Sequence, residues 1–203
     1  MKMLTEKEAE NFLEKENFEV IKRIFVKNKD ELKNVGEKIN FPWVMKVSSK
    51  KISHKKKIGG VILNIKSLDE AQIAFEKISK IENFEQVIIQ SMIKGEELII
   101  GLKKTPEFSR VIMLGAGGSN VEEKKDVSFR VCPIKESDAE EMIKELKIYG
   151  EIEKKVNLEL IRQNLLKISK LAEKNPNIQE LDINPLIVNL NEAVIVDARI
   201  SFE

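Results

Sequence analysis

Apolar runs that suit β-strands alternate along the whole chain with segments that begin like helices. Runs rich in β-branched and aromatic residues predict strands over residues 20–26, 43–47, 61–65, 87–93, 97–102, 110–114 and 127–132. A Ser, Thr or Asn followed three positions later by Glu marks helix starts at Thr5, Asn28, Ser67 and Ser137. The first three should open helices of about three turns, and further helices are expected near residues 137–149 and 157–174. This alternation predicts a mixed α/β or α+β chain.

A β-hairpin is predicted near the end of the chain, where two apolar runs flank the turn-forming segment 189–192. If the middle two residues of that segment form the loop, Asn184 lies directly opposite Asp197. Their Cβ atoms would then be about 5 Å apart. Pro185 cannot donate a hydrogen bond to the ladder, so we expect the strand to be an edge or irregular at that point.

The predicted hairpin gathers polar oxygens on one face. Asp182 points to the same side as Asn184, because strand side chains alternate. Two carboxylates and an amide oxygen form a hard-oxygen cluster, which suits Mg²⁺ better than zinc and leaves coordination positions for nucleotide phosphates. A surface hairpin with solvated polar residues is the alternative. The full set of Asp182, Asn184 and Asp197 favours the metal site.

Composition and charge narrow the classes of protein that the chain can represent. Its 203 residues allow one large or two small domains. The formal net charge is +1, so no global basic field indicates a nucleic-acid partner. No signal peptide or long apolar span is visible, and we expect a cytoplasmic protein that binds no membrane. The single Cys132 excludes an intramolecular disulfide, and its apolar neighbours favour a core position over a nucleophile.

The hairpin motif resembles the metal-binding end of the ATP-grasp domain in NDP-forming acyl-CoA synthetases, which include succinyl-CoA synthetase and ADP-forming acetate–CoA ligase. The matching residues are Asp182-Ile-Asn-Pro-Leu186 and Val196-Asp-Ala-Arg199. The resemblance implies that Asn184 and Asp197 bind Mg²⁺ on a nucleotide. The resemblance extends over nearly the whole length of the chain.

The resemblance implies a single ATP-grasp domain over residues 1–203, with the nucleotide between two α/β subdomains. One subdomain would be residues 20–93, including a basic loop at 48–60. The other would combine residues 1–19 and 94–203, with a soft boundary near Lys94-Gly95.

Lys46 is the first nucleotide-binding candidate, on the strand Trp43-Val-Met-Lys-Val. An inward-pointing lysine would need an anion such as a phosphate, whereas spacing alone favours a position on the solvent face. The family has a Val-x-Lys strand here, and the resemblance implies a phosphate contact for Lys46.

Residues 86–101 predict two strands joined by a short loop, an ordinary hairpin in which Met92 would be a core residue. The resemblance implies instead that Gln90 and Met92 line the adenine site. In the family the second strand begins Gly-Arg-Glu, and Glu97 takes the place of that Glu near the nucleotide. Glu96 replaces the Arg.

The basic loop contains His54, the only histidine, among several lysines and before Gly59-Gly60. Such a loop can be mobile and solvated, or can cradle phosphate. It resembles the family segment His-Lys-Ser-Asp-x-Gly-Gly-Val, with Lys56-Lys57 replacing Ser-Asp. The resemblance implies that Lys55 contacts the nucleotide and that His54 carries a phosphoryl group between a partner's histidine and ADP.

A glycine cluster and a following strand resemble two further motifs of the family. Gly115, Gly117 and Gly118 would permit close approach to a ligand or turns with positive φ. Arg130, in Asp126-Val-Ser-Phe-Arg, suits bidentate contact with a phosphate. An ion pair with Glu122 or Asp126 is an equal alternative for Arg130.

The resemblance implies a nucleotide-binding subunit of an ADP-forming acyl-CoA synthetase, which converts acyl-CoA, ADP and phosphate into acid, CoA and ATP. No Gly-x-Gly-x-x-Gly follows a strand, so a separate CoA-binding α subunit with a phosphorylatable histidine is the expected partner. The family's Gly-x-Arg-Gly loop is missing after Tyr149. A carboxylate–amine ATP-grasp ligase and a non-catalytic nucleotide sensor remain alternatives. Acyl and CoA selection would belong mostly to the partner, and the sequence leaves ADP and GDP as alternative nucleotides.

Overall fold

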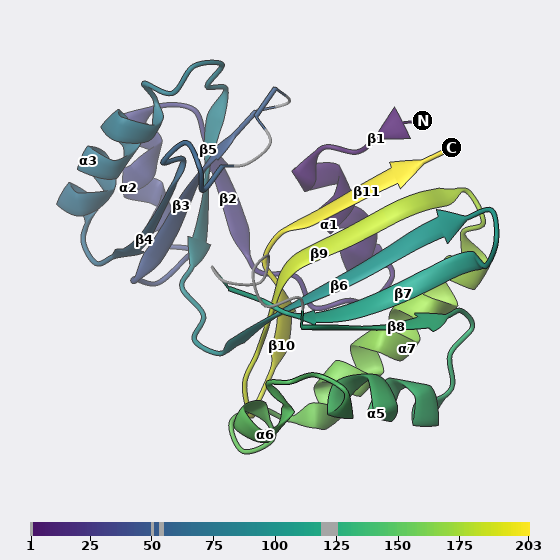
Figure 1. The fold of residues 1–203 in the computed structure, drawn as a ribbon. Helices are drawn as coiled ribbons and strands as arrows, with labels where there is room; N and C mark the ends of the chain where they lie inside the picture. Colours follow the sequence, from purple (N-terminus) through teal and green to yellow (C-terminus); the bar gives the residue numbers. More distant parts are fainter. Residues whose placement is uncertain (1, 50, 53–54, 119–125) are drawn as a thin grey trace. The chain divides into compact units, whose positions relative to one another are not determined.

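The computed structural model describes residues 2–49, 51–52, 55–118 and 126–203. The chain packs as two compact units (Figure 1). The larger unit combines Met1–Val20 with Lys94–Glu203, and the smaller unit is Ile21–Ile93.

The described strands of the larger unit form one antiparallel sheet. Its order is β1 (Lys2–Met3), β11 (Ala198–Phe202), β9 (Ile178–Val188), β6 (Glu96–Thr105), β7 (Ser109–Ala116) and β8 (Val127–Val131), with β10 (Ala193–Ile195) also paired to β9. The helices of this unit are α1 (Glu6–Lys15), α5 (Glu136–Lys144), α6 (Tyr149–Ile152) and α7 (Leu158–Lys174). Figure 1 shows α7 running along one face of the sheet.

Strand alternation decides which face of this sheet meets the helices. Leu98, Ile100 and Leu102 of β6 are buried in a single core cluster with Leu165 and Ile168 of α7. The residues between them on β6 therefore point to the opposite face. We call this opposite face the open face, and the polar residues of β9 and the β10–β11 connection lie on it.

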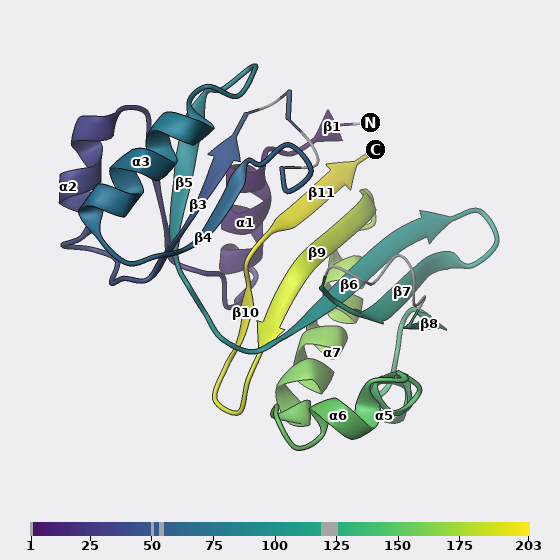
Figure 2. The same ribbon diagram turned by 60° about the vertical axis from the view of Figure 1, so that its left-hand side comes forward.

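The smaller unit is an antiparallel sheet packed against short helices. Its strands lie in the order β2 (Arg23–Val26), β5 (Gln86–Ser91), β3 (Trp43–Ser48) and β4 (Val61–Ile65). The helices are the 3₁₀ turn η1 (Lys29–Glu31), α2 (Leu32–Val35) and α3 (Leu68–Ile78). In Figure 2, α2 and α3 lie together against this sheet, and their apolar residues share a core cluster with those of β3 and β5.

Three of the four predicted helix starts are confirmed, and one of them is Asn28, whose side-chain oxygen accepts the Glu31 amide at 3.2 Å at the start of η1. Thr5 forms a complete capping box at the start of α1, and the Ser67 hydroxyl accepts a hydrogen bond from the Glu70 amide at the start of α3. The three-turn helix expected after Asn28 is wrong, because the chain forms only η1 and the single-turn α2. Gly36 follows α2, and glycine propagates a helix poorly.

The fourth helix begins earlier and ends sooner than predicted. The Asp138 carboxylate, not Ser137, caps the start of α5 by accepting the Lys135 amide at 2.7 Å. The helix expected to reach Tyr149 is divided into α5 and α6. The buried Asp126 carboxylate accepts the amides of Lys147 and Ile148 at 2.7 and 3.1 Å, which gives these groups a partner outside a continuous helix.

The mixed α and β architecture confirms the predicted fold class. The remaining strands lie within a few residues of their predicted positions. Strand β2 starts at Arg23 instead of residue 20, because Val20 pairs with Ile195 in the larger unit. Within the described ranges, no helix combines the length and the apolar character that crossing a membrane would require.

Candidate functional site

The terminal hairpin has the register predicted from its turn. The Asn189 amide donates to the Glu192 carbonyl, and the Asn184 amide donates to the Asp197 carbonyl, both at 3.0 Å. The Asn189 side-chain oxygen accepts the amides of Asn191 and Glu192 at 2.8 and 3.1 Å, which closes the two-residue loop. Asn184 therefore lies directly opposite Asp197.

The strand is irregular at Pro185, as expected for a residue without an amide hydrogen. Strand β9 is not an edge, because it lies between β11 and β6. On the β6 side the register shifts between Leu98 and Ile100. On the other side, β10 ends at Ile195 and β11 begins at Ala198, so Asp197 lies in the gap between two strands.

The candidate metal ligands share the open face of the sheet. Leu181 and Ile183 are buried in the core, so Asp182 and Asn184 point to the other side. Asn184 is exposed, whereas Asp182 and Asp197 are half-buried. Ligands of this accessibility can be reached by a nucleotide-bound ion.

Electrostatics at Asp182 disfavour its charged form. Burial raises the pKa of the Asp182 carboxyl most; Arg199 opposes this, and the charges of Asp197 and Glu180 raise the pKa further. A divalent cation would relieve this repulsion between carboxylates. Two carboxylates and an amide fit Mg²⁺ with phosphate oxygens in the remaining positions. Across the described ranges, no group of three His, Cys, Asp or Glu residues forms a ready metal cluster.

Glu97 lies on the same open face as the candidate metal ligands. It is the second residue of β6 and pairs with Ile187 of β9, while Gly101 further along β6 pairs with Asp182. Leu98 and Ile100 point into the core, so Glu97 points away from it. The structure thus places Glu97 and the hairpin oxygens on one face of one sheet.

In the smaller unit, Lys46 is buried, with 6% of its surface exposed. The solvent-face alternative that spacing alone favoured is therefore wrong. Strand β3 is flanked by β5 and β4, and Lys46 pairs with Ile88 on one side and Val61 on the other. This central position buries a charge that the alternating pattern alone would leave on the surface.

Gln90 is in β5, and Met92 follows the last residue of that strand. The hairpin predicted over residues 86–101 is wrong, because β5 and β6 belong to different sheets. Gln90 is fully buried, and it pairs with Val44 and Arg23. Met92 is half-buried, and its amide donates to the Pro42 carbonyl at 2.9 Å. The Met92 amide is thus already engaged within the chain, while its side chain is outside the fully buried core.

The described part of the basic loop ends in a compact turn next to Lys46. His54 lies outside the described residues. The Gly60 amide donates to the Lys55 carbonyl at 2.8 Å, and the Val47 amide donates to the Gly60 carbonyl at 2.7 Å. Gly59 has a φ of 70°, which favours glycine. These contacts connect the turn that begins at Lys55 to the strand that carries Lys46.

Arg130 forms ion pairs with Glu141 and Glu145, and not with Asp126, the predicted partner that the structure describes. Its guanidinium donates to Glu145 at 2.6 and 3.0 Å and to Glu141 at 3.1 Å. These contacts raise the pKa of Arg130, and the Arg130 hydrogen bond is the main cause that lowers the pKa of Glu145 to about 2. Asp126 instead caps the start of α6, and Glu122 lies outside the described residues. The role of Arg130 in phosphate contact stays a prediction.

The glycine cluster and the cysteine have structural explanations. Gly118 has a φ of 99°, which agrees with the predicted turn with positive φ. The close approach at Gly117 is to the backbone of Glu97 within the chain itself. Cys132 packs against the core, and burial raises the pKa of its thiol, which disfavours a nucleophilic thiolate.

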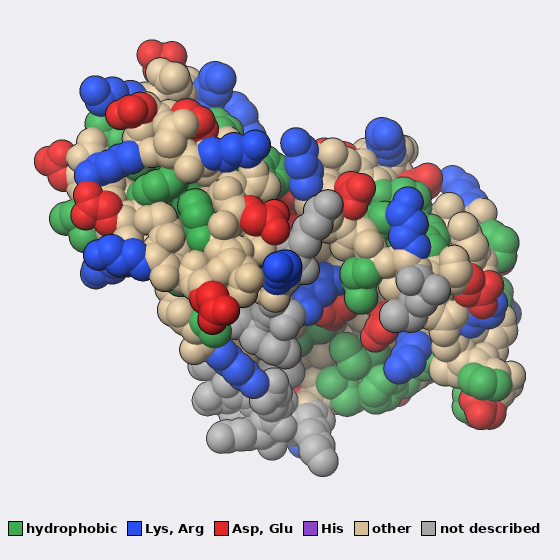
Figure 3. Space-filling view, turned by 90° about the horizontal axis from the view of Figure 1, so that it is seen from above, with side chains coloured by type: hydrophobic (Ala, Val, Ile, Leu, Met, Phe, Trp, Pro, Cys, Tyr) green, Lys and Arg blue, Asp and Glu red, His purple; other side chains and the backbone are tan. Residues whose placement is uncertain are grey.

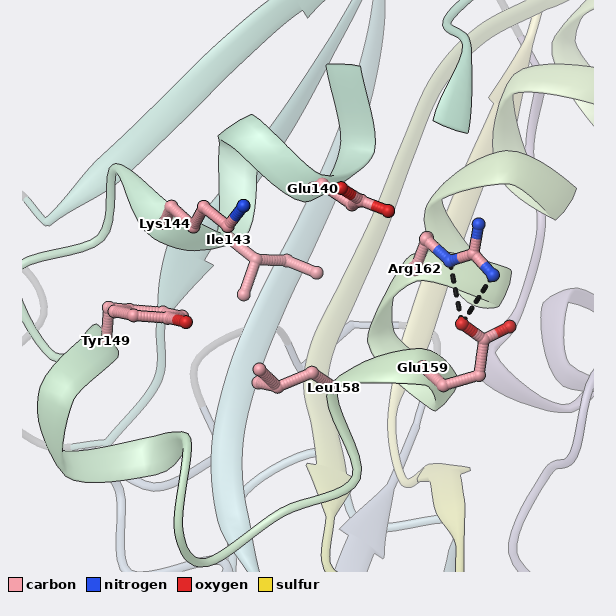
Figure 4. A pocket seen from close by; sticks show the side chains of 7 residues that line it. All are labelled: Glu140, Ile143, Lys144, Tyr149, Leu158, Glu159 and Arg162. Atoms are coloured by element: carbon pink, nitrogen blue, oxygen red, sulfur yellow. Dashed lines mark hydrogen bonds and ion pairs between the residues drawn. The ribbon is translucent and has the colours of Figure 1, made fainter. Parts of the chain in front are cut away.

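A hollow of about 210 Å³ lies among α5, α6 and α7 (Figure 4). Ile143, Tyr149 and Leu158 line it, and Arg162 at its rim is paired with Glu159. These helices cover the core face of the sheet, so the hollow is on the opposite side from Asp182. It is too small for a nucleotide. Sequence periodicity did not indicate it, because it depends on the break between α5 and α6.

Surface charge is mixed rather than segregated. On the face shown in Figure 3, basic and acidic side chains are interspersed. This distribution agrees with the nearly balanced composition of the chain.

Comparison with known proteins places these features in a family. The ATP-grasp domain family matches residues 1–202. The chain is 40% identical over 203 residues to acetate–CoA ligase [ADP-forming] II of Archaeoglobus fulgidus, covering 98% of this chain and 30% of that protein. It is 39% identical over 209 residues to acetate–CoA ligase [ADP-forming] I subunit beta of Pyrococcus furiosus, covering 97% of this chain and 90% of that subunit.

Solved structures of an acetyl-coenzyme A synthetase from Ca. Korarchaeum cryptofilum are similar over the whole chain. One, in complex with coenzyme A, Ca-AMPCP and HgCl+, has a TM-score of 0.91 and 36% identity, covering 100% of this chain and 94% of that one. Another contains coenzyme A and Mg-AMPPCP, with the phosphohistidine segment pointing towards the nucleotide binding site. Its TM-score is 0.84 at 37% identity, covering 100% and 93% of the two chains.

The chain spans about 30% of the length of the Archaeoglobus relative. It belongs to the ATP-grasp domains of the ADP-forming acetate–CoA ligase family.

Proposed function

We propose that this chain is the nucleotide-binding subunit of an ADP-forming acyl-CoA synthetase. With its partner it would convert acyl-CoA, ADP and phosphate into acid, CoA and ATP. The chain itself would carry the step between a phosphohistidine and ADP. The observation that carries the proposal is the pairing of Asn184 with Asp197 on an open sheet face, in a chain 39% identical to a β subunit of this family.

The hairpin oxygens would hold Mg²⁺ on the nucleotide. Asn184 and Asp197 are the principal ligands, and Asp182 is the third candidate, because its carboxyl shares their face. When bound, the ion neutralises negative charge on the phosphates during phosphoryl transfer. The contribution of the chain is to fix the ligands on a paired hairpin before the nucleotide arrives.

Side chains outside the hairpin would bind the rest of the nucleotide. Lys46 and Lys55 supply compact positive charges suited to phosphate, and the turn at Gly60 connects their two segments. Gln90 and Met92 would line the adenine site at the end of β5. Glu97 would contact the nucleotide from the start of β6.

A separate CoA-binding chain is the proposed partner. The Pyrococcus relative is named as a β subunit, and the Archaeoglobus relative is more than three times as long as the matched region. The Korarchaeum structures contain coenzyme A and a phosphohistidine segment. By analogy, the partner of this chain would bind CoA and present a phosphorylated histidine.

His54 would act as a second phosphoryl carrier, and Arg130 would contact the phosphoryl group. Imidazole is a competent nucleophile near neutral pH, and the neighbouring lysines would stabilise a phosphoryl group on it. In this step the phosphorus–nitrogen bond to the partner's histidine breaks as a bond to His54 forms. Transfer to ADP then regenerates the free imidazole. For Arg130, the proposal requires that it exchange part of its contact with Glu141 and Glu145 for phosphate.

Steady-state ATP formation tests the proposed function. The purified chain should bind MgADP but form no ATP from acetyl-CoA, ADP and phosphate. Adding the CoA-binding subunit from the same organism should restore ATP formation. Robust ATP synthesis by the isolated chain, or none by the reconstituted pair on a panel of acyl-CoAs, would contradict the proposal.

A non-catalytic nucleotide sensor is the second candidate. Two sequence departures favour it: Lys56-Lys57 in place of Ser-Asp, and the missing Gly-x-Arg-Gly loop in the region of α6. A sensor would bind MgADP and the partner but show no turnover. The same reconstitution therefore separates the two candidates.

A further inference from the structure

The start of β6 lies within the larger unit next to two glycines, Gly95 and Gly117, that have no room for a side chain. Strand β6 begins two residues after Lys94, where the larger unit resumes. Glu97 is its second residue and points to the open face of the sheet. The placement of the Glu97 side chain therefore depends on how firmly this segment is held.

Gly117 holds the backbone of Glu97 directly. Strand β7 ends at Ala116, which pairs with Leu98, so Gly117 continues the register opposite Glu97. The Gly117 amide donates to the Glu97 carbonyl at 2.6 Å. A Cβ atom on Gly117 would lie 2.5 Å from the carbonyl carbon and oxygen of Glu97 and 2.7 Å from its Cβ. Because carbon contacts settle at about 3.5 Å or more, any side chain there would push the Glu97 peptide away by about 1 Å.

Space, and not backbone conformation, explains the glycine at this position. Gly117 has no φ in the left-handed region, so an L-residue could adopt its conformation. Gly118 shows the opposite case, because its φ is 99° and a Cβ atom added to it would meet no atom of the described residues within 4 Å. The two neighbouring glycines thus meet different structural requirements, and an added Cβ atom would collide with Glu97 only at Gly117 of the two.

Further contacts hold the residues just before Glu97. The Asn189 side-chain amide donates to the Lys94 carbonyl at 3.0 Å. A Cβ atom on Gly95 would lie 2.4 Å from the Val188 carbonyl oxygen. The terminal hairpin that carries the candidate metal ligands therefore also packs against the segment that leads into Glu97.

We propose that Gly117 is a positioning residue for nucleotide binding, acting through Glu97. By lacking a side chain, Gly117 lets the end of β7 lie against the Glu97 peptide and fixes the direction of the Glu97 carboxylate before the nucleotide binds. This inference rests on the proposed function, because it assumes that Glu97 contacts the nucleotide.

A double-mutant cycle with MgADP calorimetry tests the proposal. Gly117→Ala should weaken MgADP binding by at least about tenfold, because misplacement of a binding group by about 1 Å can have effects of that size or larger. Glu97→Ala should weaken binding as well. In the Glu97→Ala background, Gly117→Ala should have less than about a twofold further effect, because coupled residues are not additive. The matched control is Gly36→Ala, where the nearest described atom to the added Cβ would be the Lys33 carbonyl oxygen at 3.9 Å.

The outcomes separate this inference from the proposed function. Equal effects of Gly117→Ala in both backgrounds would overturn the positioning role, since a purely structural role would not depend on Glu97. The positioning role would also be overturned if the wild-type chain binds MgADP but either Gly117→Ala or Glu97→Ala leaves that binding unchanged. The proposed function would be unaffected by that result. Failure of the wild-type chain to bind MgADP would refute the proposed function itself.

Hydrogen exchange of the wild-type chain provides a second test, which does not depend on whether any variant folds. In the nucleotide-free wild-type chain, the Gly117 amide should be protected by at least about 100-fold relative to an unstructured peptide, because its hydrogen bond to Glu97 is already formed. An unprotected Gly117 amide would show that the Glu97 segment is not held before binding and would overturn the proposal.

Discussion

Asn184 and Asp197 face each other across the terminal hairpin, with the Asn184 amide donating to the Asp197 carbonyl at 3.0 Å. The contact links the middle of β9 to the short gap between β10 and β11. Because backbone hydrogen bonds hold both residues, their side chains start from neighbouring positions on the open face. An ion bound there would meet ligands that need little rearrangement.

Removing either side chain should weaken metal-dependent nucleotide binding. Asp197→Asn removes a charge and Asn184→Ala removes an oxygen, and each should weaken MgADP binding by at least about tenfold, the loss expected for an interaction with a charged group. Binding of ADP without Mg²⁺ should change much less. Calorimetric titration with and without Mg²⁺ measures both effects.

The control for these variants is Asn191→Ala, at the exposed tip of the same hairpin. It should leave MgADP affinity and its dependence on Mg²⁺ unchanged. If Asp197→Asn and Asn184→Ala also leave both quantities unchanged, the metal assignment is wrong.

Asp182 should make the nucleotide-free chain less stable as the pH rises. Burial and neighbouring carboxylates raise the pKa of Asp182 in the folded chain above its unfolded value, so the folded state binds the proton more tightly. The penalty is absent below the unfolded pKa of about 3.9 and develops as the pH rises through the folded pKa. Asp182→Asn should therefore raise the free energy of unfolding at pH 7 and lose this advantage in acid.

Denaturant unfolding at several pH values, with and without MgADP, measures this effect. Saturating MgADP should reverse the order of the two proteins at pH 7, because the charged Asp182 then has a cation beside it. A stability difference between Asp182→Asn and wild type that is independent of pH would contradict the account.

The pair of Arg130 and Glu145 should stabilise the fold at neutral pH and lose its effect in acid. The pKa of Glu145 is lowered to about 2 in the folded chain, so its contribution is present above the unfolded value of about 4.3. It is lost as the pH falls towards 2. Glu145→Gln should lower the free energy of unfolding at pH 7 by only about 0.5–1 kcal/mol, because solvent screens this half-exposed pair.

Comparison of Glu145→Gln with wild type at pH 7 and at pH 3 or below checks this prediction. The stability difference should shrink as the pH falls. Glu140→Gln, which changes an exposed glutamate on the same helix, is the control. A difference between Glu145→Gln and wild type that grows in acid would contradict the ion-pair assignment.

His54→Asn should separate phosphorylation of the partner from ATP formation. In the reconstituted complex, the histidine of the partner subunit should still be phosphorylated from acetyl-CoA and phosphate. ATP formation should fall by at least about 100-fold, within the range expected for loss of a catalytic nucleophile. Radiolabelled phosphate followed on both chains measures the two steps. ATP formation within a few-fold of wild type would mean that phosphate reaches ADP without His54.

Local chemistry made the hairpin and several helix starts predictable. Asn189 closes a two-residue loop with its own side chain, so the register that pairs Asn184 with Asp197 follows from four consecutive residues. Thr5 and Ser67 cap helices through contacts three residues away. Each of these features depends on neighbours in the sequence, which is why pattern and spacing suffice.

Other features depend on residues that are distant in the chain. Lys46 is buried because β3 lies between β4 and β5, and no local pattern reports that arrangement. Asp126 accepts a backbone amide between α5 and α6, and it lies 21 residues before that amide in the sequence. The contact between Gly117 and Glu97 likewise joins two strands that are distant in the sequence. The only local indication of this contact is the presence of a glycine at the end of a predicted strand.

A single-turnover experiment tests the central claim most directly. The CoA-binding partner is first phosphorylated on its histidine with radiolabelled phosphate and freed of acyl-CoA and phosphate. It is then mixed with this chain and MgADP, and the label is followed over time. We expect the label to leave the partner and appear in ATP only when both this chain and Mg²⁺ are present. Label that stays on the partner in the presence of the folded, MgADP-bound chain would contradict the assignment of the nucleotide half-reaction to this protein.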